Sequence, residues 1–79
     1  MRIRTRPAAS DEHARNRLAE LVAERGEDYA GLSRWVIFRP AGYLGRYVRK
    51  GVPRRLPAGE RRTLARYFRV AECELGAGV

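Results

Sequence analysis

Apolar side chains recur along this sequence at intervals of three and four residues, which is the spacing of α-helices with one buried face. The first such stripe consists of Ala14, Leu18, Leu21 and Val22. Ser10 precedes the stripe and is suited to cap a helix N-terminus, whereas Gly26 follows it and is suited to end a helix. The pattern therefore predicts a first helix between Ser10 and Gly26.

Two short helices are expected next, close together in the sequence. Asp28 can cap the N-terminus of a second helix. Its inward face would carry Leu32, Trp35 and Val36. Pro40 disfavours helix at the preceding residue but suits the first turn of a new one. A third helix is therefore predicted from about Pro40 to Lys50, with its end at Gly51.

The last part of the sequence predicts a longer helix and a final turn. This fourth helix would begin near Pro57, and a short fifth segment would complete the core at Leu75. The inward residues of the fourth helix would be Leu64, Ala65 and Phe68. With no strand pattern and only short connections, the sequence predicts an all-α fold, a compact bundle of about five short helices. A tight turn joining the second helix to a basic third helix is the pattern of a helix-turn-helix.

Positive charge is concentrated in the middle of the chain. The 79 residues have a formal net charge of +8, yet residues 1–28 are balanced, with six basic and six acidic side chains. Residues 29–56 contain no acidic side chain. Their seven basic side chains are Arg34, Arg39, Arg46, Arg49, Lys50, Arg54 and Arg55. This distribution indicates an anionic partner, with nucleic acid first and an anionic membrane surface second.

The third helix would place its apolar and basic residues on opposite sides. With Leu44 at the centre of the buried face, Tyr47 falls at the edge of that face. The opposite side holds Gly42, Tyr43, Arg46, Arg49 and Lys50. A helix with this outward face suits the major groove of duplex DNA, where residues near the helix N-terminus meet the base edges.

The candidate DNA contacts fall into two groups. The candidate base contacts are Gly42, which allows close approach of the backbone, Tyr43, and Arg46, whose guanidinium can bond guanine. The candidate phosphate contacts are Arg34, Arg39, Arg49, Lys50, Arg54 and Arg55. Any single arginine could be an ordinary solvated side chain, so the prediction rests on the set.

Residues 1–10 are expected to form a basic N-terminal arm, and residues 11–79 the helix-turn-helix domain. Arg2, Arg4 and Arg6 alternate with small or apolar residues in the arm. They could enter a minor groove beside the main contact, as arms do in other helix-turn-helix proteins. A disordered tail and a short edge strand are the alternatives for this segment.

Several short motifs resemble a known family. They are "LSR" in the second helix, "YLGRYVRKG" in the third, "PRRL" in the connector, and "LARYF" followed by "VAECELG". Together they resemble the helix-turn-helix domain of phage-repressor-type, lambda-repressor-like regulators, in particular the N-terminal domain of LexA-like repressors that carry a serine-peptidase module. With the first helix, the resemblance covers about residues 11–76. It implies a five-helix fold with the third helix in the DNA major groove.

Two features depart from that family. The turn after the second helix usually carries a glycine, but here it reads Val36, Ile37, Phe38 and Arg39 and is about one residue longer. This bears on the angle at which the third helix enters the groove. The sequence also ends at Val79, where the peptidase module would follow a linker, so the resemblance implies no catalytic residue here.

Other chemistry finds little support in the sequence. One histidine, His13, and one cysteine, Cys73, do not make a metal site, and neither serine has a base partner in the sequence pattern. We therefore expect no enzymatic activity, no cofactor and no metal. A lone cysteine cannot form an internal disulfide, and no apolar run approaches the roughly 20 residues that span a bilayer. A cytoplasmic protein is expected, associated with the nucleoid in a bacterium or phage.

The sequence thus predicts a sequence-specific double-stranded DNA-binding transcription regulator, acting as a repressor. The alternatives are a protein-interaction or anti-repressor module with a basic face, and an RNA-binding protein. Single-strand binding needs exposed aromatic platforms, and Tyr43 is the aromatic expected to face outward. A homodimer is an open expectation, with Trp35, Phe38 and Tyr67 as contacts if they are exposed.

Overall fold

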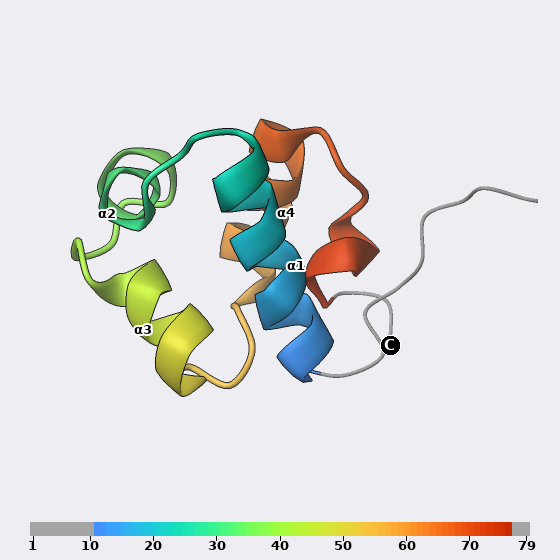
Figure 1. Cartoon of the computed structure of the whole chain (residues 1–79), viewed down its shortest axis with the longest axis horizontal. Coiled ribbons are helices and arrows are strands. Elements are labelled where there is room, and N and C mark those ends of the chain that lie inside the picture. The colour runs from blue at the N-terminus through green and yellow to red at the C-terminus, as the bar shows by residue number, and fades with distance from the viewer. Residues whose placement is uncertain (1–10, 77–79) are drawn as a thin grey trace, which may run out of the picture.

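The computed structural model describes residues 11–76, which form an all-helical domain around a central helix, α1 (Asp11–Glu24) (Figure 1). The elements that follow are α2 (Tyr29–Gly31), the π-helix η1 (Leu32–Val36), α3 (Tyr43–Lys50), α4 (Ala58–Phe68) and the 3-10 helix η2 (Glu72–Leu75). α2 and α3 lie together at one end of the molecule, whereas η2 packs against α1 and α4. The described residues contain no strand, so the predicted all-α class is confirmed.

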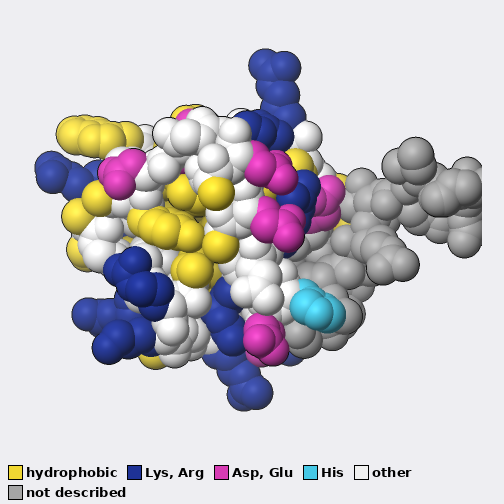
Figure 2. All heavy atoms as spheres, in the orientation of Figure 1, with side chains coloured by type: hydrophobic (Ala, Val, Ile, Leu, Met, Phe, Trp, Pro, Cys, Tyr) yellow, Lys and Arg dark blue, Asp and Glu magenta, His cyan; other side chains and the backbone are white. Residues whose placement is uncertain are grey.

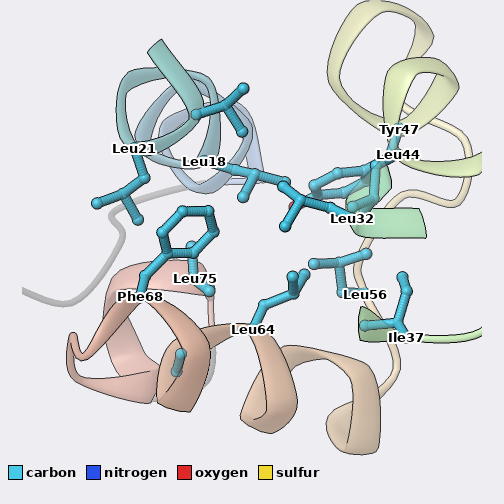
Figure 3. Close-up of a cluster of buried hydrophobic side chains, with 12 residues drawn as sticks. Leu18, Leu21, Leu32, Ile37, Leu44, Tyr47, Leu56, Leu64, Phe68 and Leu75 are labelled. Atoms are coloured by element: carbon cyan, nitrogen blue, oxygen red, sulfur yellow. The ribbon is translucent and has the colours of Figure 1, made fainter. Parts of the chain in front are cut away.

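The core forms where these helices meet. Figure 3 shows buried side chains from each part of the chain gathered in one cluster: Leu18, Leu21, Leu32, Ile37, Leu44, Tyr47, Leu56, Leu64, Phe68 and Leu75. Leu44 and Tyr47 are the contribution of α3, and both are almost completely buried. One side of α3 is therefore fixed to the core, which leaves the other side to the solvent.

The first helix follows its sequence pattern closely. The predicted stripe is buried throughout: Ala14, Leu18, Leu21 and Val22. Gly26, with φ of 64°, takes the left-handed conformation that ends the helical turn, as expected. The Asp28 carboxylate accepts a hydrogen bond of 3.0 Å from the backbone N–H of Gly31, which confirms it as the N-cap of α2. The predicted cap at Ser10 lies outside the described residues.

The second helix differs from the prediction at Trp35. Its expected inward position is wrong, because 70% of the Trp35 surface is exposed. Residues 32–36 form a π turn, in which the N–H of Ile37 donates to the Leu32 carbonyl five residues earlier. A π turn holds one more residue than an α turn. It therefore brings Ile37 into the core beside Leu32 and leaves Trp35 facing the solvent.

The turn between η1 and α3 contains an aromatic residue in a left-handed conformation. Phe38 has φ of 57°, and 78% of its surface is exposed. This turn contains no glycine, and Phe38 takes the conformation that glycine adopts without strain. That conformation costs a non-glycine residue about 1–2 kcal/mol. The Arg39 N–H closes the turn by donating to the Ser33 carbonyl at 2.7 Å.

The third helix is shorter than predicted. It begins at Tyr43 rather than at Pro40, which lies in the connecting turn and accepts a hydrogen bond from the Tyr43 N–H. Gly42 is its N-cap, with φ of −83°. Its end at Gly51 is confirmed, because Gly51 has φ of 69° and donates its N–H to the Tyr47 carbonyl. Tyr47, expected at the edge of the buried face, is fully inside it.

The C-terminal elements agree with their predicted positions. Pro57 is the N-cap of α4, and the inward residues Leu64, Ala65 and Phe68 are buried. Leu75 in η2 completes the core. The expected count of about five short helices is not confirmed, because η2 is a single 3-10 turn and α2 continues directly into η1. No helix within residues 11–76 combines the length and apolar character needed to cross a membrane.

Candidate nucleic-acid interface

The start of α3 is capped by a side chain from the preceding helix. Gly42, its N-cap residue, has no side chain to accept a hydrogen bond from the first turn. Ser33 does this instead: its buried hydroxyl oxygen accepts from the Leu44 N–H at 3.1 Å and donates to the Tyr29 carbonyl at 2.8 Å. One hydroxyl group therefore joins α2, η1 and α3, and it sets the position of α3 relative to the helix before it.

A second contact ties the same end of α3 to α4. The Tyr43 hydroxyl donates to Glu60 Oε1 at 2.7 Å, and the Arg39 guanidinium pairs with Oε2 of the same carboxylate. Arg39 also lies over the Tyr43 ring, 5.2 Å from its centroid. Desolvation, together with the hydrogen bond to Glu60, raises the pKa of Tyr43 to about 12. Glu60 is the buried centre of this group.

Tyr43 and Arg39 therefore differ from their expected settings. Tyr43 was expected on the outward side of the helix, but it is half-buried and its hydroxyl is engaged with Glu60. Arg39, a candidate phosphate contact, remains partly exposed while its guanidinium is held by the same carboxylate. Both side chains contact Glu60 of α4 and thereby help to position the start of α3.

The outward side of α3 carries cations that no carboxylate within residues 11–76 neutralises. Arg46, Arg49 and Lys50 are exposed, and none of them forms an ion pair with another of the described residues. The Arg49 guanidinium lies against the helix at Gly45, where an added Cβ would come within 2.7 Å of it. Figure 2 shows the corresponding concentration of basic side chains over the end of the molecule that contains α3.

Gly42 lies at the exposed beginning of this surface. A Cβ built on Gly42 would meet nothing within 4 Å, so the space in front of it is open. Its φ of −83° is available to any residue, so the turn itself does not require a glycine here. The arrangement is compatible with close approach of another molecule to the backbone at this point.

Arg54 and Arg55 share one carboxylate at the start of α1. Asp11 accepts from Arg54 at 3.1 Å and from Arg55 at 2.9 Å. The hydrogen bond from Arg55 is the main cause of a lowered Asp11 pKa. Both arginine side chains are still largely exposed, at 86% and 69%. Exposed ion pairs of this kind are weak and are readily exchanged for other partners.

Arg34 completes the set of candidate contacts within the described residues. It is exposed on η1, with its guanidinium 5.2 Å from the centroid of the Trp35 ring. Arg34 thus lies on the helix that Ser33 connects to α3. Arg2, Arg4 and Arg6, the proposed minor-groove arm, lie outside the described residues.

Four residues that shape this surface were missed or misplaced by the sequence analysis. Ser33 and Glu60 are polar residues at buried positions, and nothing in their local sequence pattern reveals their distant partners. Trp35 was expected in the core, and Phe38 was considered only as a dimer contact. The lack of a glycine in this turn was the sequence feature that could have indicated the unusual backbone conformation of Phe38.

The described residues contain no group of three side chains placed to hold a metal ion. Comparison of the chain with protein-family models, with curated proteins and with solved structures finds no match.

Proposed function

We propose that this protein is a sequence-specific double-stranded DNA-binding transcription regulator of the helix-turn-helix, lambda-repressor-like type. In this proposal the helix of residues 29–36 and α3 form the helix-turn-helix, and α3 enters the major groove. Bound at an operator, the domain would act as a repressor by excluding other proteins from that site. Its chemistry is binding alone.

The observation that carries the proposal is the outward surface of α3. Arg46, Arg49 and Lys50 are exposed and have no acidic partner in the described part of the chain. The helix that bears them is held by Leu44, Ser33 and Glu60. A helix held in a fixed position can present side chains to particular base edges, which allows selection of a sequence. Its exposed cations can contact the phosphates, which provides affinity. An ordinary soluble surface would intersperse charges of both signs.

The residues have different proposed roles. Of the three cations on α3, Arg46 is the closest to the helix N-terminus. It would contact a base through the two parallel N–H donors of its guanidinium. Arg34, Arg49, Lys50, Arg54 and Arg55 would contact phosphates. Gly42 would allow the backbone to approach the groove. We assign Tyr43 and Arg39 mainly to positioning, because Glu60 already engages their polar groups.

Selection of binding sites from random duplex DNA, using the full chain, tests the proposal. We expect a recurring motif, and a palindromic motif would indicate binding as a homodimer. Titration of the selected duplex at several salt concentrations should give log affinity falling linearly with log salt, by roughly 0.9 per phosphate neutralised. No enriched motif and no salt dependence would contradict the proposal and favour a protein partner.

A further inference from the structure

Two large aromatic side chains project into the solvent just before α3. Trp35 is 70% exposed at the end of η1, and Phe38 is 78% exposed in the turn that follows. They are separated by two residues and belong to the segment that joins α2 to α3, and α2 and α3 lie together at one end of the molecule (Figure 1). Tyr43 was the aromatic expected to face outward, but Trp35 and Phe38 are the exposed ones. Aromatic side chains are therefore available for contact with unpaired bases.

Phe38 combines an exposed side chain with a strained backbone conformation. A residue with φ of 57° is strained unless it is a glycine, and no core packing compensates for this strain, since most of the side chain is in water. Backbone strain of this kind is characteristic of positions that serve a binding role. The π turn in η1 adds to this, because the same irregularity turns Trp35 outward.

The charges around the two rings indicate what covers them. Arg34 lies 5.2 Å from the Trp35 ring centroid, and residues 29–56 contain no acidic side chain. Glu60, which pairs with Arg39 next to Phe38 in the sequence, is buried and already engaged. A second copy of the chain, meeting this one through the same face, would bring two sets of uncompensated cations together. A nucleic acid instead supplies both phosphates for the cations and flat bases for the rings.

We propose that Trp35 and Phe38 stack on bases of the bound DNA at a step that is kinked or unpaired. The proposal rests on the duplex-binding function above and adds the form of the preferred ligand, a duplex with one opened step. α3 would hold the duplex in its groove, while the two rings occupy the space that unstacking creates. Apolar side chains used in this way kink a duplex, and the cost falls where the step is flexible or mismatched.

The test compares three labelled ligands that share one sequence. They are a continuous duplex, the same duplex with a central mismatched step, and the single strand. The duplex carries the selected motif or, if none is found, an arbitrary sequence. A mismatched step costs less to open than a paired step, so the mismatched duplex should bind tighter than the continuous duplex. Stacking of one base on an aromatic ring is worth roughly 5- to 150-fold in affinity, so Trp35→Ala should lose about that much on the mismatched duplex. Trp35 is the sole tryptophan of the chain, so its fluorescence should be quenched on binding.

Three variants separate stacking from folding. Trp35→Ala should bring the ratio of the two duplex affinities close to one, without loss of stability, because the ring is exposed. Phe38→Gly should lower the same ratio while raising the unfolding temperature, because glycine relieves the strain at φ of 57°. Tyr67→Ala is the matched control, an exposed aromatic on α4, and should leave the ratio unchanged.

The outcomes distinguish this inference from the function on which it rests. Equal binding of both duplexes with unchanged Trp35 fluorescence overturns the inference alone, whereas no binding to any ligand overturns the proposed function as well. If the single strand binds most tightly, the protein is a single-strand binder, and the proposal of a duplex with an opened step is wrong. A dimer that forms in solution and is lost in Trp35→Ala, with no fluorescence change on DNA, assigns the surface to a second copy.

Discussion

The Tyr43 hydroxyl donates a hydrogen bond of 2.7 Å to Oε1 of Glu60, and this bond joins the first residue of α3 to α4 across 17 residues of sequence. Arg39 occupies the other oxygen of the same carboxylate. The start of α3 is therefore fixed by a buried acceptor that belongs to a different helix. The start of this helix is therefore held by a hydrogen bond of the neutral Tyr43 hydroxyl as well as by apolar packing.

The first prediction concerns alkaline pH. The pKa of Tyr43 is raised from its ordinary value of 10.0 to about 12, first by desolvation and then by the bond to Glu60. The folded state thus favours the neutral hydroxyl, so Tyr43 contributes stability that is complete below pH 10 and is lost as the pH rises through about 12. We expect Tyr43→Phe to lose less stability over this range than the parent, measured by urea unfolding at each pH.

Other tyrosines set the baseline for that measurement. The pKa values of Tyr29 and Tyr47 are raised by burial, and that of Tyr67 by its hydrogen bond to Glu27, so some alkaline loss should remain in Tyr43→Phe. Tyr67→Phe removes an exposed hydroxyl and serves as the comparison, because it should reduce the alkaline loss by less than Tyr43→Phe does. Identical alkaline profiles for Tyr43→Phe and the parent would show that ionisation of Tyr43 does not contribute to the loss of stability.

The second prediction concerns the hydroxyl group of Ser33. Ser33→Ala should destabilise the fold by about 1–3 kcal/mol, because it leaves the buried Leu44 N–H without an acceptor. Thr63→Ala removes an exposed hydroxyl that donates to the Gly59 carbonyl, and should stay within about 0.5 kcal/mol of the parent. Chemical unfolding measures both. An equal effect of the two substitutions would rule out a special role for Ser33.

The third prediction separates two kinds of arginine. Arg46→Ala should lose about 1–3 kcal/mol on the selected duplex and relax the preference at one base position, as expected when a bidentate base contact is removed. Arg55→Ala should weaken binding to all duplexes similarly and reduce the salt slope by about 1. Titrations on selected and random duplexes at several salt concentrations measure these effects. If both variants behave alike, the assigned roles are incorrect.

The fourth prediction concerns Gly42. Alanine is a poorer N-cap than glycine but also restricts the unfolded chain, so Gly42→Ala should change stability by less than about 1 kcal/mol. Its added methyl group would point into open space in the free protein and should weaken DNA binding if the backbone approaches the groove. Thermal unfolding and duplex titration measure the two effects separately.

Gly59→Ala is the matched control for that comparison. Gly59 lies in the first turn of α4, where an added Cβ also meets nothing within 4 Å. Alanine there should raise stability by up to about 1 kcal/mol and leave binding unchanged. Unchanged binding in Gly42→Ala as well would mean that the glycine at the start of α3 has no part in the interface.

Local patterns predicted those features that depend on neighbouring residues. The buried stripe of α1, the cap at Asp28 and the end of α3 at Gly51 each follow from side chains a few positions apart. The basic segment was likewise evident from composition, and the exposed positions of Arg46 and Lys50 agree with the helical spacing.

The features that were not predicted depend on distant or irregular contacts. The start of α3 is set by Ser33 and Glu60, whose partners lie 11 and 17 residues away. The exposure of Trp35 depends on a π turn, and the regular period of 3.6 residues does not anticipate the residue that a π turn adds. The left-handed conformation of Phe38 was unexpected because the residue type disfavours it.

The cap that Ser33 supplies also limits how α3 can hold an anion. The N-terminal amides of a helix are a common phosphate site, because they are unpaired and lie at the positive end of the helix dipole. In α3 the Tyr43 amide already donates to Pro40, and the Leu44 amide to Ser33. These two amides are therefore already engaged, and the exposed side chains of Arg46, Arg49 and Lys50 would supply most of the attraction to a phosphate chain. Under the proposed function, contacts made by these side chains could shift along a DNA backbone without breaking the hydrogen bonds that hold the start of α3 in place.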